Sequence, residues 1–472
     1  MSATRLGLLG ALALFAAGCG GGSDNTGTGN TGTGNSTGTG GQVVTGTGGT
    51  GALGTGGDTA TGGVTGTGGT GATSAPGPFS LQSPLQGSSA QPLTPQLSWE
   101  TAEGAATYAV EIATSTAFGT SDVFQQIVDA PATTLTVPTA TLAPGVIYYW
   151  RVSAQNGSDY TIATGAPQWF SSPYLVLGAH GIGATPDGQR LVVASEVSSG
   201  PIALVDLAGH TVTTIDTGVN SEPIGIAIAP DGQEAVATLL TTGTNGVNGA
   251  VVVDLVNNVV EGTIADPCVG TTLGDIAYFP NGAAAMPDLS PGCAAMGLST
   301  FDPVLNNPQF AFANFSDTND PYGVAVGPDG TFALVTMELD KQLYRVDFPS
   351  GTVSHITLSS SSAGVAITPD GTKAVVAEST LDVVDVGTGA VTPITLTGDT
   401  PGGDFHNVAI TPDGKVAVVA GTTSVQFVSL VDDSVLASYP ASTGTSVATS
   451  PDGTLAYMTD KGNGWVRVLP IP

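Results

Sequence analysis

Positive charge is scarce in this chain of 472 residues, which has 9 Lys and Arg against 38 Asp and Glu and a net charge of −29. Nucleic acids and anionic membrane surfaces would repel such a protein, so the charge balance argues against nucleic acid as a partner. Only four His and three Cys are present. They leave little material for a multi-metal enzyme or a cysteine-rich scaffold.

Familiar catalytic patterns are also missing. The sequence contains no His-Glu-x-x-His and no Cys-x-x-Cys-His. The N-terminal Gly-Thr-Gly units resemble a dinucleotide-binding loop only superficially, since no strand precedes them and no helix follows. The sequence therefore favours a protein that is not an enzyme.

The N-terminus lacks a hydrophobic run long enough to span a membrane. The apolar stretch Leu6–Ala17 follows a cationic start and is shorter than the about 20 residues of a spanning helix, which is typical of an export signal. The segment Ala16-Ala17-Gly18-Cys19 resembles a bacterial lipobox, which implies that residues 1–19 are a lipoprotein signal and that Cys19 is lipidated. Gly20 then implies, in a Gram-negative host, sorting to the outer membrane or cell surface. An ordinary signal peptide is the alternative.

Residues 20–76 consist almost entirely of Gly, Thr, Asn, Ser and Ala. Such a segment has little apolar surface to bury, so we predict a disordered Gly/Thr-rich linker. A flexible chain of about 57 residues has a mean reach on the order of 40 Å. The segment is therefore interpreted as a spacer between an anchor and folded domains.

Residues 77–172 carry short alternating strands separated by turn signals, a pattern typical of a two-sheet sandwich of about 100 residues. The strand around Trp99 and the corner Leu142-Ala-Pro-Gly-Val-Ile-Tyr148 resemble a fibronectin type III domain. The resemblance implies that the Tyr148 side chain bonds to the backbone and holds the corner. We expect a rigid spacer, or a weak contact for a protein or carbohydrate ligand.

Residues 173–472 contain a repeat with a period of about 40–50 residues, the range of propellers and solenoids. A Pro-Asp-Gly turn begins at Pro186, Pro230, Pro328, Pro369, Pro412 and Pro451, and Pro280-Asn281-Gly282 fills the one gap. A β-branched residue stands four positions before each proline, followed by a small residue where neighbouring sheets should approach closely. Three further apolar runs follow in most repeats, which predicts four strands per unit and seven units.

The two ends of this region supply a missing strand. The last repeat stops after its third run, Trp465–Leu469, and Tyr174–Leu177 stands unused before the first repeat. Pairing them would close a ring and remove two exposed edges. The pattern resembles the YVTN/lactonase-like β-propeller repeats, which implies an all-β protein with a seven-bladed propeller after the sandwich. The Pro-Asp-Gly units are interpreted as turns, because each offers one carboxylate, too few for calcium.

The repeat places two histidines, His180 and His406, at equivalent positions two residues before Ile182 and Val408. Loops at the same end of the sheets carry acids, so this face could bind a cation or a cationic ligand. The alternative is a solvated polar face. The residues expected on the face are His180, His406, Glu222, Asp275, Asp317, Asp320, Asp404, Glu196, Glu338, Asp340, Glu378 and Asp460.

Cys268 and Cys293 fall in the third repeat on one face, and an oxidising compartment favours a disulfide between them. The loop of about 25 residues would be stabilised by about 3 kcal/mol. The other two histidines, His210 and His355, fall on outer strands and are expected at the surface.

Three hypotheses follow. The first is a lipid-anchored surface or periplasmic protein that displays a propeller for non-catalytic binding or scaffolding, with an unknown protein or carbohydrate ligand and no identified cofactor. The second is a lactonase-like propeller hydrolase that uses a divalent cation on the acidic face. The third is a structural component of the cell envelope. The first leads, because the sequence has a tether, a spacer and a display domain but no recognisable reactive group of residues.

Overall fold

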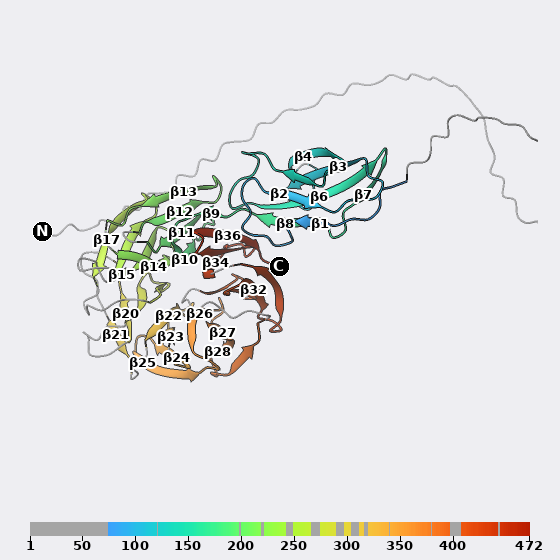
Figure 1. The fold of residues 1–472 in the computed structure, drawn as a ribbon. Helices are drawn as coiled ribbons and strands as arrows, with labels where there is room; N and C mark the ends of the chain where they lie inside the picture. Colours follow the sequence, from blue (N-terminus) through green and yellow to red (C-terminus); the bar gives the residue numbers. More distant parts are fainter. Residues whose placement is uncertain are drawn as a thin grey trace, which may run out of the picture. The chain divides into compact units, whose positions relative to one another are not determined.

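The computed structural model in Figure 1 describes residues 74–119, 121–197, 200–218, 221–241, 249–265, 274–288, 297–303, 311–315, 320–338, 340–378, 380–396, 407–441 and 444–472. The predicted signal with Cys19 and most of the predicted linker lie outside these residues, as do Cys268, Cys293, Asp317, Asp404 and His406. The described residues form strands and no helix, which confirms the all-β prediction. None of them belongs to a helix that could span a membrane.

Two sheets form the sandwich. The three-stranded sheet has the order β1 (Leu81–Ser83), β2 (Gln96–Trp99), β5 (Thr134–Thr136). The five-stranded sheet has the order β4 (Asp122–Asp129), β3 (Thr107–Ala113), β6 (Ile147–Asn156), β7 (Asp159–Ile162), with β8 (Gln168–Ser171) on the other end of β6.

Aromatic side chains fill the core of the sandwich, where Trp99, Tyr108 and Trp150 are buried. The Tyr148 hydroxyl accepts a hydrogen bond of 2.8 Å from the Ala143 N–H, which is the corner contact that the fibronectin resemblance implies. Burial raises the pKa of Tyr148 above its ordinary value, so this side chain is neutral at physiological pH.

Seven four-stranded antiparallel sheets, here called sheets 1 to 7, account for the described strands after residue 173. Sheet 1 has β10 (Ala179–Ala184), β11 (Arg190–Ser195), β12 (Ile202–Asp206) and β13 (Thr211–Ile215). Sheet 2 has β14 (Ser221–Ile228), β15 (Glu234–Thr241), β16 (Gly249–Asp254) and β17 (Val259–Ala265). Sheet 3 has β18 (Ala277–Tyr278), β19 (Ala284–Asp288), β20 (Gly297–Phe301) and β21 (Ala311–Asn314).

The same order continues to the C-terminus. Sheet 4 has β22 (Pro321–Val326), β23 (Phe332–Met337), β24 (Gln342–Asp347) and β25 (Thr352–Thr357). Sheet 5 has β26 (Ser362–Ile367), β27 (Lys373–Glu378), β28 (Leu381–Asp385) and β29 (Val391–Ile394). Sheet 6 has β30 (Val408–Ile410), β31 (Val416–Ala420), β32 (Ser424–Ser429) and β33 (Val435–Pro440). Sheet 7 has β34 (Gly444–Thr449), β35 (Leu455–Asp460), β36 (Trp465–Pro470) and β9 (Tyr174–Leu175).

The first strands of successive sheets contact one another in chain order, and β34 of sheet 7 contacts β10 of sheet 1 (Figure 1). Second strands such as β23 are buried along their whole length because neighbouring sheets cover both faces, whereas outer strands such as β33 alternate between half-buried and exposed residues. Tyr174 pairs with Val466 and Leu175 with Trp465. The predicted pairing of the two ends is confirmed, although β9 is only two residues long.

Threonine hydroxyls join some sheets to the next. Thr238, Thr336 and Thr459 occupy the same place on the second strands of sheets 2, 4 and 7. Each hydroxyl accepts an N–H from the first strand of its own sheet and donates to a carbonyl at the start of the next sheet. The Thr459 hydroxyl donates to the His180 carbonyl at 2.6 Å, so the closing contact uses the same bond as contacts inside the chain.

The Pro-Asp-Gly units are turns, and they also stack. Each aspartate, or Asn281 in sheet 3, accepts the backbone N–H two residues later. The turn glycine faces the proline of the preceding turn in several sheets: Gly232 faces Pro186, Gly371 faces Pro328 and Gly453 faces Pro412. Gly188 faces Pro451 in the same way, so this contact also bridges sheets 7 and 1.

Candidate functional site

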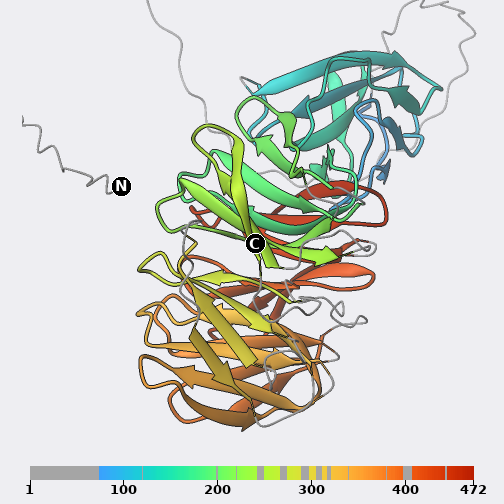
Figure 2. The same cartoon turned by 90° about the vertical axis from the view of Figure 1, so that its left-hand side faces the viewer.

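The sandwich and sheet 7 belong to one unit, Thr70–Pro472, and meet along β36. Only Ser172 and Pro173 separate β8 from β9. The Ser171 hydroxyl donates to the Val468 carbonyl at 2.7 Å, and Arg467 Nη1 donates to the Ser89 hydroxyl at 3.3 Å. Because β9 pairs with only the first two residues of β36, the rest of that edge of β36 is left open to contacts with the sandwich. Figure 2 shows the sandwich next to the red strands of sheet 7.

An aromatic contact anchors this junction. Trp169 of β8 packs edge-on against Tyr439 of β33 with ring centroids 5.0 Å apart. Trp169 belongs to the same hydrophobic cluster as residues of sheets 6 and 7, including Phe427 and Leu469. A cluster that crosses from one folded region to another makes the two a single packed body at this point.

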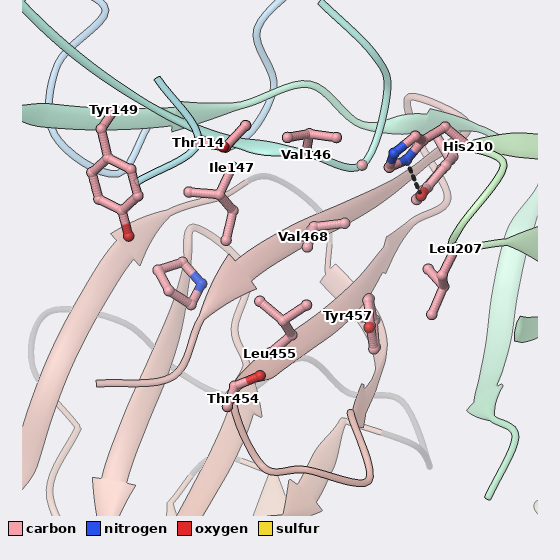
Figure 3. Close-up of a pocket in the computed structure, with 13 residues that line it drawn as sticks. Thr114, Val146, Ile147, Tyr149, Leu207, His210, Thr454, Leu455, Tyr457 and Val468 are labelled. Atoms are coloured by element: carbon pink, nitrogen blue, oxygen red, sulfur yellow. Dashed lines mark hydrogen bonds between the residues drawn. The ribbon is translucent and has the colours of Figure 1, made fainter. Parts of the chain in front are cut away.

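A cavity of about 480 Å³ lies beside the junction, between the sandwich and sheets 7 and 1 (Figure 3). Sandwich residues Val146 and Ile147 form one wall, and Leu455 and Val468 of sheet 7 form another. The Leu207 side chain of sheet 1 lies at the remaining side. The volume of the cavity falls within the range of about 300–1,000 Å³ that is typical of small-molecule sites, which are mostly apolar and often lie between domains.

Hydroxyl and imidazole groups supply the polar part of the cavity wall. His210 Nδ1 lies 3.4 Å from the Tyr174 hydroxyl, the contact drawn in Figure 3. Burial raises the pKa of Tyr457 to about 12 and raises that of Tyr174 further. Both phenols therefore keep their protons at neutral pH, as suits groups in a wall that is otherwise mainly apolar.

The predicted residue His180 is buried on β10 of sheet 1, and its ring contacts sheet 2. Its Nε2 lies 3.1 Å from Glu196 Oε2, and its Nδ1 lies 3.3 Å from the Ile224 carbonyl oxygen. Lys461 Nζ lies 2.5 Å from the same Glu196 oxygen. Both ring nitrogens of His180 therefore face protein oxygens, and a metal ion would have to displace these contacts.

The other predicted face residues do not gather around His180. Glu222 and Asp320 are half-buried and Glu338 is exposed. Asp275 is buried, and its carboxylate accepts backbone N–H groups of Ile276 and Val324. No group of three potential metal ligands occurs among the residues that the structure describes. Glu378 ends β27, but its side chain, like His406 and Asp404, lies outside the described part, and so does the predicted Cys268–Cys293 disulfide.

Asp460 belongs to the junction rather than to an open face. It is fully buried and forms an ion pair of 2.6 Å with Arg467 Nη2, while Asn463 donates to both of its oxygens. Because Arg467 also donates to Ser89, the pair links sheet 7 to the sandwich. The repeat pattern placed Asp460 on a ligand-binding face, whereas a buried carboxylate of this kind is held by its protein partners.

Comparison with solved structures identifies the fold. Hydrazine synthase of Kuenenia stuttgartiensis is similar over 62% of this chain and 96% of its own, with a TM-score of 0.53 and 20% identity. The β-propeller domain of Cps50 (Swd1) of Myceliophteria thermophila is similar over 64% of this chain and 99% of its own, with a TM-score of 0.53 and 10% identity. The fold is propeller-like. No family model and no curated protein matches the sequence.

His210 is the cavity residue that sequence reasoning misplaced. It was expected at the surface, as was His355; the structure shows His355 exposed but His210 half-buried in the cavity wall. His210 has a φ of +53° in the turn after the third strand, where other sheets of the propeller-like region use Asn258, Asp433 or Gly389. A histidine in a turn position that favours Gly, Asn and Asp was the available signal.

Proposed function

We propose that this protein is an exported, lipid-anchored binding protein of the bacterial cell surface. In this proposal residues 1–19 are a lipoprotein signal, residues 20–76 a tether, residues 77–172 a fibronectin type III-like sandwich and residues 173–472 a seven-bladed propeller. The corner bond of Tyr148 supports the assignment of the sandwich. The seven four-stranded sheets and their closing contacts support the assignment of the propeller.

The observation that carries the binding role is the cavity beside the sandwich–propeller junction. Its walls come from strands and turns of two folded regions that share the cluster around Trp169, so packing between the two regions holds the cavity open. A ligand that binds a preformed cavity gains affinity, because few side chains and loops have to become ordered on binding. We assign it a small, mainly apolar ligand with one polar group near His210 and Tyr174.

A fluorescence titration with the neutral apolar dye N-phenyl-1-naphthylamine tests the cavity. Leu455→Trp adds bulk inside it and should weaken dye binding at least tenfold. The matched control is Leu436→Trp, because Leu436 is 45% exposed on β33 and lies away from the cavity. Dye affinity that is equal in both variants and the parent protein would place binding elsewhere and overturn the assignment.

Labelling with radioactive palmitate in a Gram-negative host tests the anchor. Cys19→Ser should abolish the label and release the protein from membranes, whereas Cys268→Ser should keep the label, since only Cys19 stands in the lipobox-like segment. An unlabelled parent protein would mean that the N-terminus is an ordinary signal peptide, and the tether would then not be membrane-bound.

A further inference from the structure

The five-stranded sheet of the sandwich has a second hollow on the face opposite its core, and no residue that lines it also lines the junction cavity. It has a volume of about 260 Å³. Ala109 of β3 and Ser153 of β6 form its floor and are paired partners in the sheet. Because side chains alternate between faces along a strand, Glu111 and Arg151 share this face and stand at one end of the floor. Small side chains between larger ones create the trough.

A fixed ion pair closes that end of the trough. Arg151 Nε lies 2.6 Å from Glu111 Oε2, and Arg151 Nη2 lies 3.0 Å from Glu111 Oε1. The hydrogen bonds that Arg151 donates to the Glu111 carboxylate raise the pKa of Arg151 above its ordinary value, and the guanidinium carbon lies 4.2 Å from the Phe118 ring centroid. The charges cancel within the pair, so the end of the trough is strongly polar but carries no net charge.

Amides and one exposed aromatic ring complete the walls. Gln125 of β4 lies opposite Glu111 in the sheet, and Gln155 of β6 lies opposite Tyr160 of β7. The Tyr160 side chain is 62% exposed and Ile162 beside it is 43% exposed, although both are large residues that proteins usually bury at least in part. The trough thus offers one uncovered ring face among side chains that donate and accept hydrogen bonds.

We propose that this trough binds a single neutral sugar ring of a glycan. A sugar ring has an apolar C–H face, which fits the Tyr160 ring, and hydroxyl groups that both donate and accept, which fit Gln125, Gln155 and the outer edges of Glu111 and Arg151. The volume lies below the about 300 Å³ of drug-sized sites, so one ring fills the trough and the rest of the glycan extends into solvent.

Other ligand classes fit less well. An anion would meet a protein of net charge −29 and would have to compete with Glu111 for Arg151. A cation would have to compete with Arg151 for Glu111, and an apolar ligand would leave the amides and the ion pair without water. This inference names a carbohydrate partner for the proposed surface-display role and rests on that role, but it uses a different site from the junction cavity.

Isothermal titration calorimetry of the purified protein against neutral oligosaccharides (gluco-, xylo-, galacto- and manno-oligosaccharides) tests the proposal. At least one should bind, Tyr160→Ala should weaken it at least tenfold, and Tyr160→Phe should retain most of the affinity because the ring remains. Gln155→Ala should also weaken binding. Val123→Ala is the matched control on the same sheet, since Val123 is 40% exposed and does not line the trough.

Two results would overturn the sugar site: no binding by any of these oligosaccharides, or unchanged binding by Tyr160→Ala. If Leu455→Trp abolished sugar binding while Tyr160→Ala did not, the sugar would occupy the junction cavity, and the proposed binding function would stand without this site. Dye binding and palmitate labelling report on the proposed function independently of either result.

Discussion

Neighbouring sheets of the propeller are joined by contacts that recur from sheet to sheet, whereas the sandwich and the propeller are joined by contacts that each occur once. Between sheets, small contacts recur: a threonine hydroxyl bridging two backbones, or a turn glycine facing a proline. At the junction the contacts do not recur: they include an aromatic pair, a bond from the Ser171 hydroxyl, and a bond to Ser89 from the ion-paired Arg467. The free energy that stabilises sheet-to-sheet packing is therefore spread over many equivalent sites, whereas the free energy that stabilises the junction depends on a few residues.

This difference predicts how each region responds to substitution. Loss of one repeated contact leaves the neighbouring sheets and the other bridges in place, so the cost should be small and local. When a residue that anchors the junction is removed, no equivalent contact remains there to stabilise it. Four substitution experiments, ordered by expected effect, test this contrast.

Trp169→Ala should give the largest effect. Removing a buried tryptophan from the cluster shared with Phe427 and Leu469 should lower the free energy of unfolding by about 3–5 kcal/mol. Denaturant unfolding of the purified protein measures this change. Trp465→Ala, which removes a half-buried ring at the end of β36, should cost less. Equal costs for the two variants would mean that the Trp169 cluster does not anchor the junction.

The repeat and its ends could be predicted from the sequence, but the junction could not. Pro-Asp-Gly spacing and the unused segment at Tyr174 locate sheets and closure, because backbone turns and strand pairing depend on local chemistry and on a repeated pattern. Trp169, Ser89 and Arg467 carry no pattern of this kind. Ser171 contacts Val468 across 297 residues of chain and Ser89 contacts Arg467 across 378, and each contact occurs only once.

The candidate site shows the same division. The repeat register assigned His180 and Asp460 to a possible ligand face, yet it could not show that Glu196 and Arg467 pair with them. Side-chain partners are chosen by packing between sheets, which a register does not specify. His210 could have been found by comparing turn residues across repeats, because it replaces the Gly, Asn or Asp that this turn favours.

Gly145→Ala should give the next largest effect. Gly145 has a φ of +74°, and a Cβ there would lie 2.0 Å from the ring of Tyr174. Gly104 is a matched control in the same sandwich, with a φ of +78° and no atom within 4 Å of the added Cβ. Both substitutions strain the backbone equally, so the clash should make Gly145→Ala worse by about 1–3 kcal/mol in denaturant unfolding. Equal losses would show that the junction can shift away from the sandwich.

Thr459→Val should cost about 1–3 kcal/mol, because it removes the hydroxyl but keeps the shape and leaves the His180 carbonyl and the Ser446 N–H without this partner. Thr336→Val removes the matching bond between sheets 4 and 5. Unfolding midpoints in urea should fall by similar amounts if the closing contact resembles an internal one. A much larger loss for Thr459→Val would instead show that the ring is weakest where its two ends meet.

The smallest effect concerns acid and the turn aspartates. The Thr368 hydroxyl and the Thr372 N–H hold the pKa of Asp370 below its ordinary value of 3.8, so the folded state gains stability from this carboxylate at neutral pH and loses it as pH falls below about 4 through the lowered pKa. Asp370→Asn keeps the acceptor oxygen and removes the titration, so thermal unfolding followed from pH 7 to pH 2 should show a slightly flatter pH dependence.

Asn281→Asp makes the opposite change in a turn where Phe279 replaces the threonine, and it should add less acid sensitivity than Asp370→Asn removes. Identical pH profiles for the parent protein and Asp370→Asn would mean that this carboxylate is bound no more tightly in the folded than in the unfolded chain.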